Sequence, residues 1–539
     1  MSQGRGDGDD RAMLTDGPPA WRVQSVPLGG SALSQMLQAD PTAHGWLAAR
    51  PAERTAWTAW VHRVQAGAQG HDWLTPLAPA FAAAGRAADR LARAADHGVV
   101  VTTGQQPGLF GGPGYTWSKA ISALAMADLL EEQTGVPVAP VFWAATDDAD
   151  WIEAASTQLA TMRGLQTLQL AGPATEGMAL ADVALGPLEE ALQALRAASG
   201  SAAQRSVLEL VEQAYVPHAT IGAAYVQLLR AVLEPMGIAV LDAAHPAVRR
   251  AADPLLRRAL QQATPVHDAL MARTQAMTQA GHLPQVDVVE SLSLVFRTET
   301  APSGRGRVRA RVPLSDASRV AREAEAGTLG ANVLLRPVIE RALLPTVAYH
   351  AGPGEYAYFA QVSAVAAALE LESPLAVPRW AGEVIETRMD ALRDTLGLTD
   401  ALLRDPHAAE QHVARAALST ESVDALDRLR VAIETQVRAL RDATSGTDEL
   451  LSPAVVDGLA AQLELRVERF ERRMVAAVKR REGTRLREVA AVRAALRPDG
   501  HSPERRLNLM PMLARYGVEI LEAMRREARA HVERLVHGR

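Results

Sequence analysis

The chain contains no cysteine, and this absence removes several kinds of chemistry. Disulfide bonds, thiolate metal sites and cysteine nucleophiles are all excluded. The absence agrees with a reducing cytoplasm, where disulfides rarely persist. Aromatic residues are also scarce, at 4% of the chain. Alanine is abundant instead, and it favours helix.

No hydrophobic run in the sequence is long enough to cross a bilayer, which takes about 20 residues. The longest strongly apolar run covers residues 136–145, and the N-terminus lacks the apolar core of a secretory signal. We interpret residues 1–18, which are polar and glycine-rich, as a disordered tail. The formal net charge of −6 does not favour nucleic acid. The sequence therefore predicts a cytoplasmic protein that binds neither membrane nor nucleic acid.

Two stretches of the sequence have the pattern of a βαβ unit. In the first, an apolar strand (98–102), a glycine-rich loop (103–114), a helix (115–132) and a second strand (136–145) follow one another. In the second, the strand at 344–350 is followed by a glycine turn, a helix to about residue 371 and the strand at 374–379. Two such halves predict one doubly wound parallel sheet of the Rossmann-like α/β class.

About two hundred residues separate the two halves. This interval predicts a further strand near 237–242 and a hairpin, with strands in 291–297 and 307–314 and a turn within 301–306. We interpret residues 19–380 as one core, with the connecting segments in about 151–330. Residues 381–500 would form a helical coiled-coil domain, and residues 501–539 a C-terminal segment that packs back on the core.

The helical domain has a heptad-like spacing of apolar residues on two consecutive long helices. Such spacing predicts an αα-hairpin or coiled coil, and the alternative is a helix packed on the main body. The expected seam consists of Leu426, Leu429, Ile433, Val437 and Leu440 on the first arm and Val456, Leu459, Leu463, Val467, Phe470, Met474 and Val478 on the second.

The glycine-rich loop is the first candidate site. Five glycines and two prolines between residues 104 and 114 would leave backbone N–H groups free to face a phosphate or carboxylate at the start of a helix. The sequence matches neither the GxGxxG nor the GxxxxGK[ST] pattern, and a tight structural turn is the alternative. On the following helix, Tyr115, Ser118 and Lys119 lie within about one turn, and Lys119 is expected to be exposed and to hold an anion.

Acidic residues follow the strand that ends near residue 145. Asp147, Asp148, Asp150 and Glu153 lie just past the carboxyl end of that strand, which is where open α/β sheets bind ligands. Carboxylates there could hold Mg²⁺ or a substrate ammonium group. The alternative is a set of acids that cap a helix and complement its dipole.

A third candidate segment covers residues 334–361. Arg336 would suit a bidentate anion contact, although an arginine is more often a solvated or ion-paired surface charge. Glu355 follows a glycine turn at a helix start, and His350 at a strand end is either a base or a structural histidine.

These segments resemble those of a known family. VTTGQQPGLFGGPGYTWSKAISA, PVFWAATDDADWIE, LLRPVIERALLPTVAYHAGPGEYAYFAQ, VPRW and SPERRLNLMPMLARYG are similar, in order and spacing, to signature segments of the bacillithiol-biosynthesis cysteine-adding enzymes. The resemblance covers almost the whole chain from about residue 20. It implies a Rossmann-like core related to class I aminoacyl-tRNA synthetases, and a C-terminal coiled coil used for homodimerisation. The implied reaction is amide formation between cysteine and the amine of glucosamine-malate.

The resemblance also implies site residues. The implied catalytic residues are Asp148, Asp150, Lys119 and Tyr115. The cofactor-binding set, for ATP with Mg²⁺ possible, is Gly104, Gln105, Gln106, Gly112 and Lys119, and the substrate-binding set is Arg336, Gly352 and Glu355. No dedicated metal site is expected.

The sequence departs from the family at two positions. Ala149 stands where the family usually has histidine, and Pro503 stands where it usually has glutamine. The missing imidazole leaves alternatives to a cysteine ligase open. These are a non-catalytic nucleotide- or metabolite-binding protein on a decayed synthetase-like scaffold, or a coiled-coil adaptor.

Overall fold

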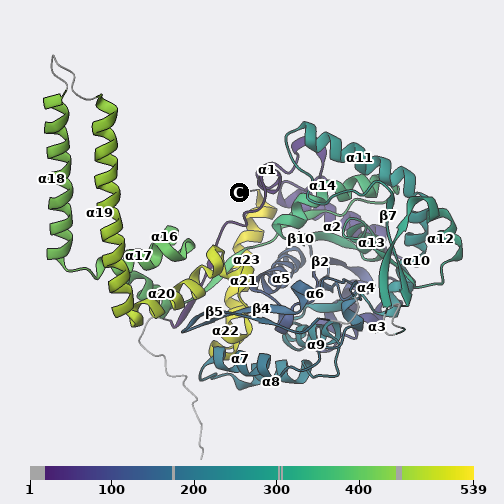
Figure 1. Ribbon diagram of the computed structural model, residues 1–539. Helices are drawn as coiled ribbons and strands as arrows, with labels where there is room; N and C mark the ends of the chain where they lie inside the picture. Colours follow the sequence, from purple (N-terminus) through teal and green to yellow (C-terminus); the bar gives the residue numbers. More distant parts are fainter. Residues whose placement is uncertain (1–18, 173–175, 301–303, 305–306, 445–451, 539) are drawn as a thin grey trace, which may run out of the picture.

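A sheet of five parallel strands lies at the centre of the molecule, in the order β11-β10-β2-β3-β6 (Figure 1). The computed structural model describes residues 19–538, except 173–175, 301–303, 305–306 and 445–451, so the expected tail over 1–18 lies outside the described residues. The doubly wound Rossmann-like sheet predicted from the sequence is confirmed. Its strands are β2 (Val99–Gln105), β3 (Val138–Ala144), β6 (Ala239–Asp242), β10 (Thr346–Ala351) and β11 (Ala376–Pro378).

The strand β2 is buried on both faces, which explains its uninterrupted valines. Val99 and Val101 belong to the same hydrophobic cluster as helix α5 (Gly114–Thr134), whereas Val100 packs with helix α4 (Gly85–His97) on the other face. Successive side chains of a strand point to opposite faces, so one valine run supplies both cores.

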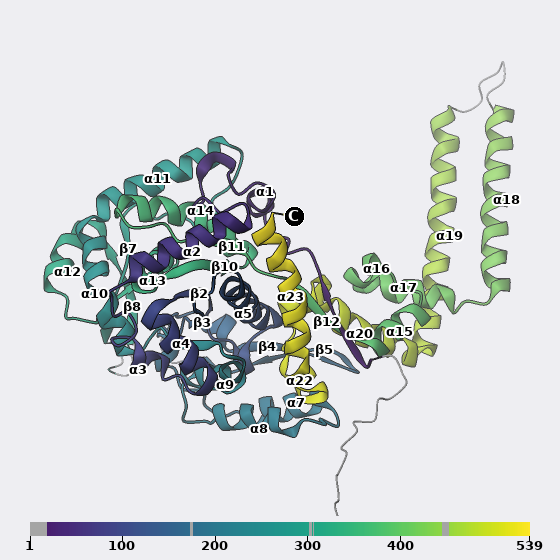
Figure 2. The same cartoon turned by 180° about the vertical axis from the view of Figure 1, so that it is seen from behind.

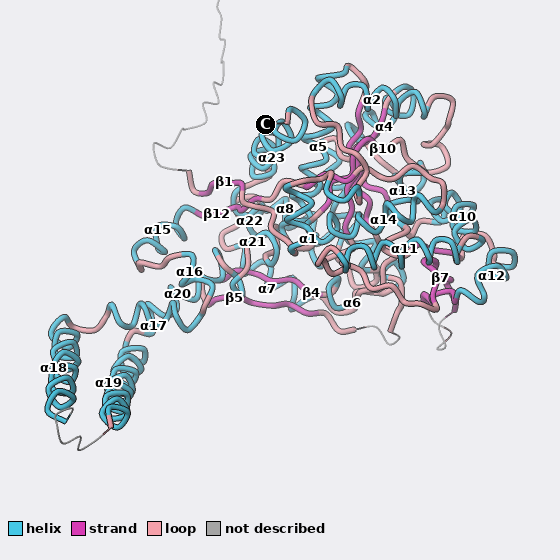
Figure 3. Tube along the Cα trace, turned by 90° about the horizontal axis from the view of Figure 1, so that it is seen from above, coloured by secondary structure: helices cyan, strands magenta, loops and turns pink. Residues whose placement is uncertain are grey.

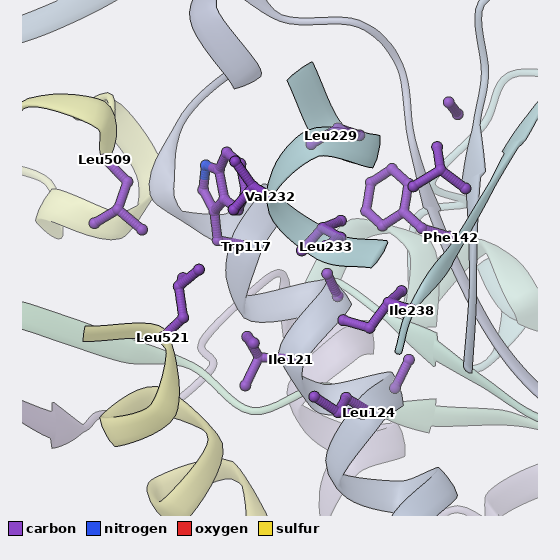
Figure 4. Close-up of a cluster of buried hydrophobic side chains, with 14 of the residues drawn as sticks. Trp117, Ile121, Leu124, Phe142, Leu229, Val232, Leu233, Ile238, Leu509 and Leu521 are labelled. Carbon is purple, nitrogen blue, oxygen red and sulfur yellow. The ribbon is translucent and has the colours of Figure 1, made fainter. Parts of the chain in front are cut away.

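Helix α5 crosses from β2 to β3 and is covered on its outer side by the end of the chain. Helix α23 (Glu519–His537) runs across it (Figure 2), and Leu509 and Leu521 lie beside Trp117 and Ile121 of α5 (Figure 4). Two ion pairs join the helices, Arg525–Asp128 at 2.7 Å and Arg529–Glu132 at 2.6 Å. The last segment of the chain therefore forms part of the core of the sheet domain.

An insertion separates the two halves of the sheet. It contains a three-stranded antiparallel sheet with the order β8-β7-β9, formed by β7 (Leu292–Thr300), β8 (Arg307–Pro313) and β9 (Leu329–Ala331). The expected hairpin is confirmed, and most of its turn lies outside the described residues. The chain then returns to the sheet through α13 (Arg336–Leu343), β10, the crossover helix α14 (Pro353–Ala368) and β11.

The helices α18 (Thr420–Thr444) and α19 (Pro453–Arg481) form an antiparallel pair that projects from the main body (Figures 1 and 3). This arrangement confirms the helical hairpin and rules out a helix packed on the core. The expected seam is correct only in part. Leu426, Val456, Val467 and Val478 are buried, but Phe470 is 55% exposed. Leu429, Leu440 and Leu459 are likewise exposed, because the apolar stripe is wider than the contact between the two arms.

Smaller elements complete the fold. Strand β1 (Trp21–Ser25) pairs with β12 (Gly382–Glu386), and β4 (Ser156–Thr161) pairs with β5 (Gly164–Gln169). Among the described residues, no helix is both long and apolar enough to span a membrane. The remaining α-helices are α1 (Ala32–Ala39), α2 (Arg54–Ala68), α3 (Ala78–Phe81), α6 (Trp151–Ala154), α7 (Glu189–Ser199), α8 (Arg205–Ala214), α9 (Ile221–Leu233), α10 (Pro246–Gln261), α11 (Ala263–Gln279), α12 (Ala317–Glu323), α15 (Thr387–Thr395), α16 (Asp400–Arg404), α17 (Pro406–Ala416), α20 (Gly483–Leu496), α21 (Pro503–Arg506) and α22 (Met510–Tyr516).

Candidate functional site

A cavity of about 350 Å³ lies at the carboxyl edge of the central sheet. Strand β2 leads through α5 to β3 on one side, and β10 leads through α14 to β11 on the other, so the winding reverses between β2 and β10. Open α/β sheets bind their ligands in the crevice at such a switch point. The cavity is lined from both sides of this point, by Gly104, Gln105 and Gln106 at the end of β2 and by Glu355 after β10.

Lys119 joins the two halves of the sheet beneath this cavity. Its ammonium group donates to the carbonyl of Gly104 at 2.8 Å and to Oε1 of Gln105 at 2.7 Å, and it pairs with Oε2 of Glu355 at 2.5 Å. An ammonium has three protons, so these partners use all of them. The residue is only 3% exposed, so the expectation of an exposed lysine is wrong. The helix α5 enters the core at once, and Lys119 therefore faces Glu355 and the end of β2.

Glu355 presents an ionised carboxylate to the cavity. Burial acts to raise the pKa of this group, but Lys119 and the hydrogen bonds from Gly352 N and Tyr349 OH, both at 2.7 Å, outweigh burial and lower it. The absence of a side chain at Gly352 leaves room for Glu355 and Lys119 to meet. A Cβ there would lie 3.2 Å from the Glu355 carboxylate and 3.5 Å from Cε of Lys119.

The glycine-rich loop is mostly buried. The N–H groups of Gly111, Gly112 and Gly114 donate to the carbonyls of Gly108, Leu109 and Leu507. The expectation that the whole loop offers free N–H groups is therefore wrong, and Gly112 does not line the cavity. A cofactor role for Gly112 stays a prediction.

The C-terminal segment holds this loop in place. The side-chain amide of Asn508 donates to the carbonyls of Leu109 and Phe110, at 3.0 and 3.1 Å. Nearby, Glu504 forms a buried ion pair with Arg379 at 2.6 Å and accepts from the hydroxyl of Ser118 at 2.9 Å. The loop and the start of α5 are thus braced by residues almost four hundred positions away in the chain.

The acidic cluster divides into two parts. Asp147 and Asp148 line the cavity, and burial raises the pKa of Asp148 despite a hydrogen bond from Ala149 N and Arg309 at 3.8 Å. The side chain of Asp148 is 41% exposed, so a substrate can reach it. Asp150 does not line the cavity. Its carboxylate caps α6 by accepting from Glu153 N at 3.1 Å, which is the alternative that the sequence left open.

Tyr115 and Gln106 meet at Glu153 on the outer side of the site. The Tyr115 hydroxyl and the Gln106 amide donate to the two oxygens of that carboxylate, at 2.9 and 2.7 Å. Burial raises the pKa of Glu153 and, helped by Glu153, also that of Tyr115. Tyr115 is not part of the cavity lining, so its catalytic role stays a prediction.

Cationic side chains also line the cavity. Arg336 lines it, and its guanidinium donates to Glu340 at 2.8 Å and to the hydroxyl of Tyr349 at 3.2 Å. Burial raises the pKa of Glu340 to about 7, while the neighbouring Arg336 opposes the shift. Arg336 is thus already paired with the buried carboxyl group of Glu340.

Sequence reasoning missed several residues of the cavity lining. Phe296, Arg309, Arg311, Asn332 and Tyr358 also line the cavity. The alternation RVRARV in the predicted hairpin was the available signal, because residues two apart in a strand share a face. His350, by contrast, is fully buried in β10, and burial lowers its pKa to about 3. It is a neutral core residue and not a base facing the cavity.

Comparison with known proteins agrees with this architecture. A model of the bacillithiol biosynthesis BshC N-terminal Rossmann-like domain matches residues 71–380, and a model of the BshC C-terminal coiled-coil domain matches residues 383–534. The chain belongs to the BshC family.

Relatives named "Putative cysteine ligase BshC" are similar over most of their length. The relative from Solibacter usitatus is 31% identical over 446 residues, which cover 80% of this chain and 82% of the relative. The relative from Koribacter versatilis is 30% identical over 449 residues, with 81% and 82% covered, and that from Geobacillus kaustophilus is 25% identical over 452 residues, with 80% and 82% covered. Membership places the chain in a family of bacillithiol biosynthesis whose similar relatives are named as cysteine ligases.

Replacement of Lys119 by alanine should destabilise the protein. It leaves the Glu355 carboxylate buried without its cation, and such a loss costs about 3–5 kcal/mol. Denaturant unfolding at pH 7 measures the free energy. The double variant Lys119→Ala/Glu355→Gln, which removes both charges, should recover most of the loss. A single variant with wild-type stability would show that the ion pair does not hold the switch point together.

Proposed function

We propose that this member of the BshC family joins L-cysteine to the amine of glucosamine-malate, with nucleotide-dependent activation of the cysteine carboxylate. The observation that supports this best is the cavity at the switch point, which is lined by both carboxylates and guanidinium groups. An acceptor that carries an amine and two carboxylates matches both kinds of charge. The cytoplasmic location expected from the sequence belongs to the same proposal.

The two cavity carboxylates have different protonation behaviour and therefore suit different tasks. Glu355, whose pKa is lowered, stays ionised and suits the binding of an ammonium group. Asp148, whose pKa is raised, is the better proton acceptor for the glucosamine amine as it attacks the activated carbonyl. The carbonyl carbon forms a bond to the amine nitrogen, loses its activating group, and one amine proton passes to Asp148. Asp150 would contribute only through the shape of the turn.

The nucleotide would supply the leaving group that makes amide formation favourable. The residues expected to bind its phosphates do not fit that task as the sequence suggested, because Lys119 has no free proton and the loop amides of Gly111, Gly112 and Gly114 are already bonded. Gly104, Gln105 and Gln106 remain as the loop residues that reach the cavity. No group of three or more acidic or histidine side chains able to hold a metal is found in the described part of the chain, so Mg²⁺ would have to arrive with the phosphates.

A non-catalytic binding protein is the second candidate function. The observation that favours it is Ala149, which stands between Asp148 and Asp150 where the family usually has histidine. The cavity and its charged side chains would then bind a metabolite without converting it.

Incubation of the purified protein with cysteine, glucosamine-malate and ATP separates the two functions. A ligase consumes cysteine only when both other substrates are present, and mass spectrometry identifies the amide and the nucleotide product. Binding of glucosamine-malate without turnover would favour the non-catalytic function.

Substitutions in the acidic cluster should distinguish the proposed proton acceptor, Asp148, from the helix cap, Asp150. Asp148→Asn keeps the hydrogen bond from Ala149 N and removes a carboxylate whose pKa is raised, so stability at pH 7 should hold or increase. Turnover should fall roughly a hundredfold or more if Asp148 takes the proton. Asp150→Ala should cost about 0.5–2 kcal/mol of stability through loss of the cap, with turnover retained. The two roles would have to be exchanged if Asp150→Ala alone abolished turnover without destabilising the fold.

We also propose that the projecting hairpin forms a homodimer interface. Its apolar stripe is wider than the contact between α18 and α19, and Leu459 and Phe470 remain 41% and 55% exposed. They are eleven residues apart, which is about three helical turns, so they share one face of α19. A second copy of the same hairpin presents the same stripe and is the occupant that fits it.

The interface is tested by Leu459→Glu/Phe470→Glu, measured by light scattering on a sizing column. The two introduced glutamates should convert a dimer into a monomer. Its helix content should stay unchanged, because both side chains lie outside the buried seam. Leu465→Glu is the control, since Leu465 is 42% exposed and points from another face of α19. A dimer that survives the double substitution would place the contact elsewhere.

A further inference from the structure

The β7–β8 hairpin forms the wall of the cavity that faces the carboxyl edge of the sheet. Phe296, Arg309 and Arg311 of this hairpin line the cavity. Phe296 lies directly opposite Arg311 in the strand register, and Arg309 is two residues earlier on β8, so all three side chains share one face. The guanidinium carbons of Arg309 and Arg311 lie 4.2 and 5.6 Å from the centre of the Phe296 ring.

Neither of these two arginines has a carboxylate within hydrogen-bond distance among the described residues. Arg309 donates to the backbone carbonyls of Asp147 and Ala331, and its nearest carboxylate, Asp148, is 3.8 Å away. Arg311 has no hydrogen bond or ion pair with any described residue, and burial together with Arg309 lowers its pKa. An aromatic face attracts a guanidinium without cancelling its charge. Two like charges thus face one cavity, and an anion between them would relieve their repulsion.

Asn332 adds an unused donor to the same wall. It is 4% exposed and lines the cavity, and its Oδ1 accepts from the backbone N–H groups of Leu334 and Leu335 at 3.1 and 3.0 Å. These bonds fix the orientation of the amide, and its Nδ2 has no partner within the described chain. A buried donor without an acceptor costs free energy, so its presence in a cavity wall points to a ligand.

We propose that Arg309, Arg311 and Asn332 form the subsite that binds the dicarboxylate end of the acceptor substrate. This assignment rests on the proposed function for the identity of that substrate. Residues two apart on a strand are separated by about 7 Å, so the two guanidinium groups can address two carboxylates at once. Arg336 is less suited to this role because it is already paired with Glu340.

The nucleotide phosphates share the chemistry of a dicarboxylate but match this cavity less well. Asp147 and Asp148 line the same cavity as the arginines, and they would repel a triphosphate. A molecule with carboxylates at one end and an amine at the other finds an opposite charge in the cavity for each end. The hairpin would therefore orient the acceptor so that its amine lies near Asp148.

Substitution of Arg311 tests the subsite in the full-length protein. Malate alone is the first probe, because its binding can be measured by calorimetry without turnover, and lactate, which has one carboxylate fewer, is the matched ligand control. Arg311→Gln should weaken malate binding and raise the KM for glucosamine-malate by roughly tenfold or more, the size of one charge-assisted hydrogen bond. The KM for ATP should stay near its wild-type value, and Arg311→Lys should restore only part of the affinity.

Arg297→Gln is the matched control variant, because Arg297 follows Phe296 on β7 and points to the other face of the hairpin. It should leave malate binding unchanged. Loss of ATP affinity with intact malate binding in Arg311→Gln would assign the arginines to phosphate and overturn the proposal, as would unchanged affinity for both. A wild-type protein that binds malate through Arg311 but forms no amide would support the subsite and reject the proposed reaction.

Discussion

The buried ion pair between Lys119 and Glu355 is the contact on which the rest of the site depends. It joins the helix that follows β2 to the helix that follows β10, at the point where the winding of the sheet reverses. A parallel sheet has an open crevice at such a point. Lys119 lies at the base of this crevice. It fixes the end of β2 by donating to the carbonyl of Gly104, and its charge keeps the Glu355 carboxylate ionised.

The insertion between the two halves adds cationic side chains to that crevice. The sheet supplies carboxylates, since Asp147 and Asp148 follow β3 and Glu355 follows β10. The β7–β8 hairpin supplies guanidinium groups, which Phe296 supports without neutralising them. In the proposed function, the residues that follow the sheet strands bind the amine of the acceptor, and the hairpin binds its carboxylates. The sheet and the insertion would then each recognise one end of the same ligand.

The sequence predicted the secondary-structure elements that depend on a local pattern of residues. The valine run of β2, the strand before Asp147 and the alternation in β7 and β8 are short-range signals, and each gave the correct element. It did not predict which charged groups are already partnered. Lys119 looked exposed because it follows a glycine loop, but its three acceptors come from separate segments of the chain. Likewise, Phe470 fitted the heptad spacing and yet lies outside the seam, because spacing does not reveal how wide the contact with the other arm is.

The glycine-rich loop is held by residues 504–508, which are synthesised long after it. Asn508 holds the carbonyls of Leu109 and Phe110, Leu507 accepts from Gly114, and Glu504 reaches Arg379 and Ser118. During synthesis on the ribosome, the first βαβ unit emerges several hundred residues before these partners do. Until residues 504–508 arrive, the loop carbonyls and the start of α5 must be satisfied by water. Maturation of the ligand site is therefore a late event, coupled to docking of the C-terminal segment, although the residues that line the cavity are made much earlier.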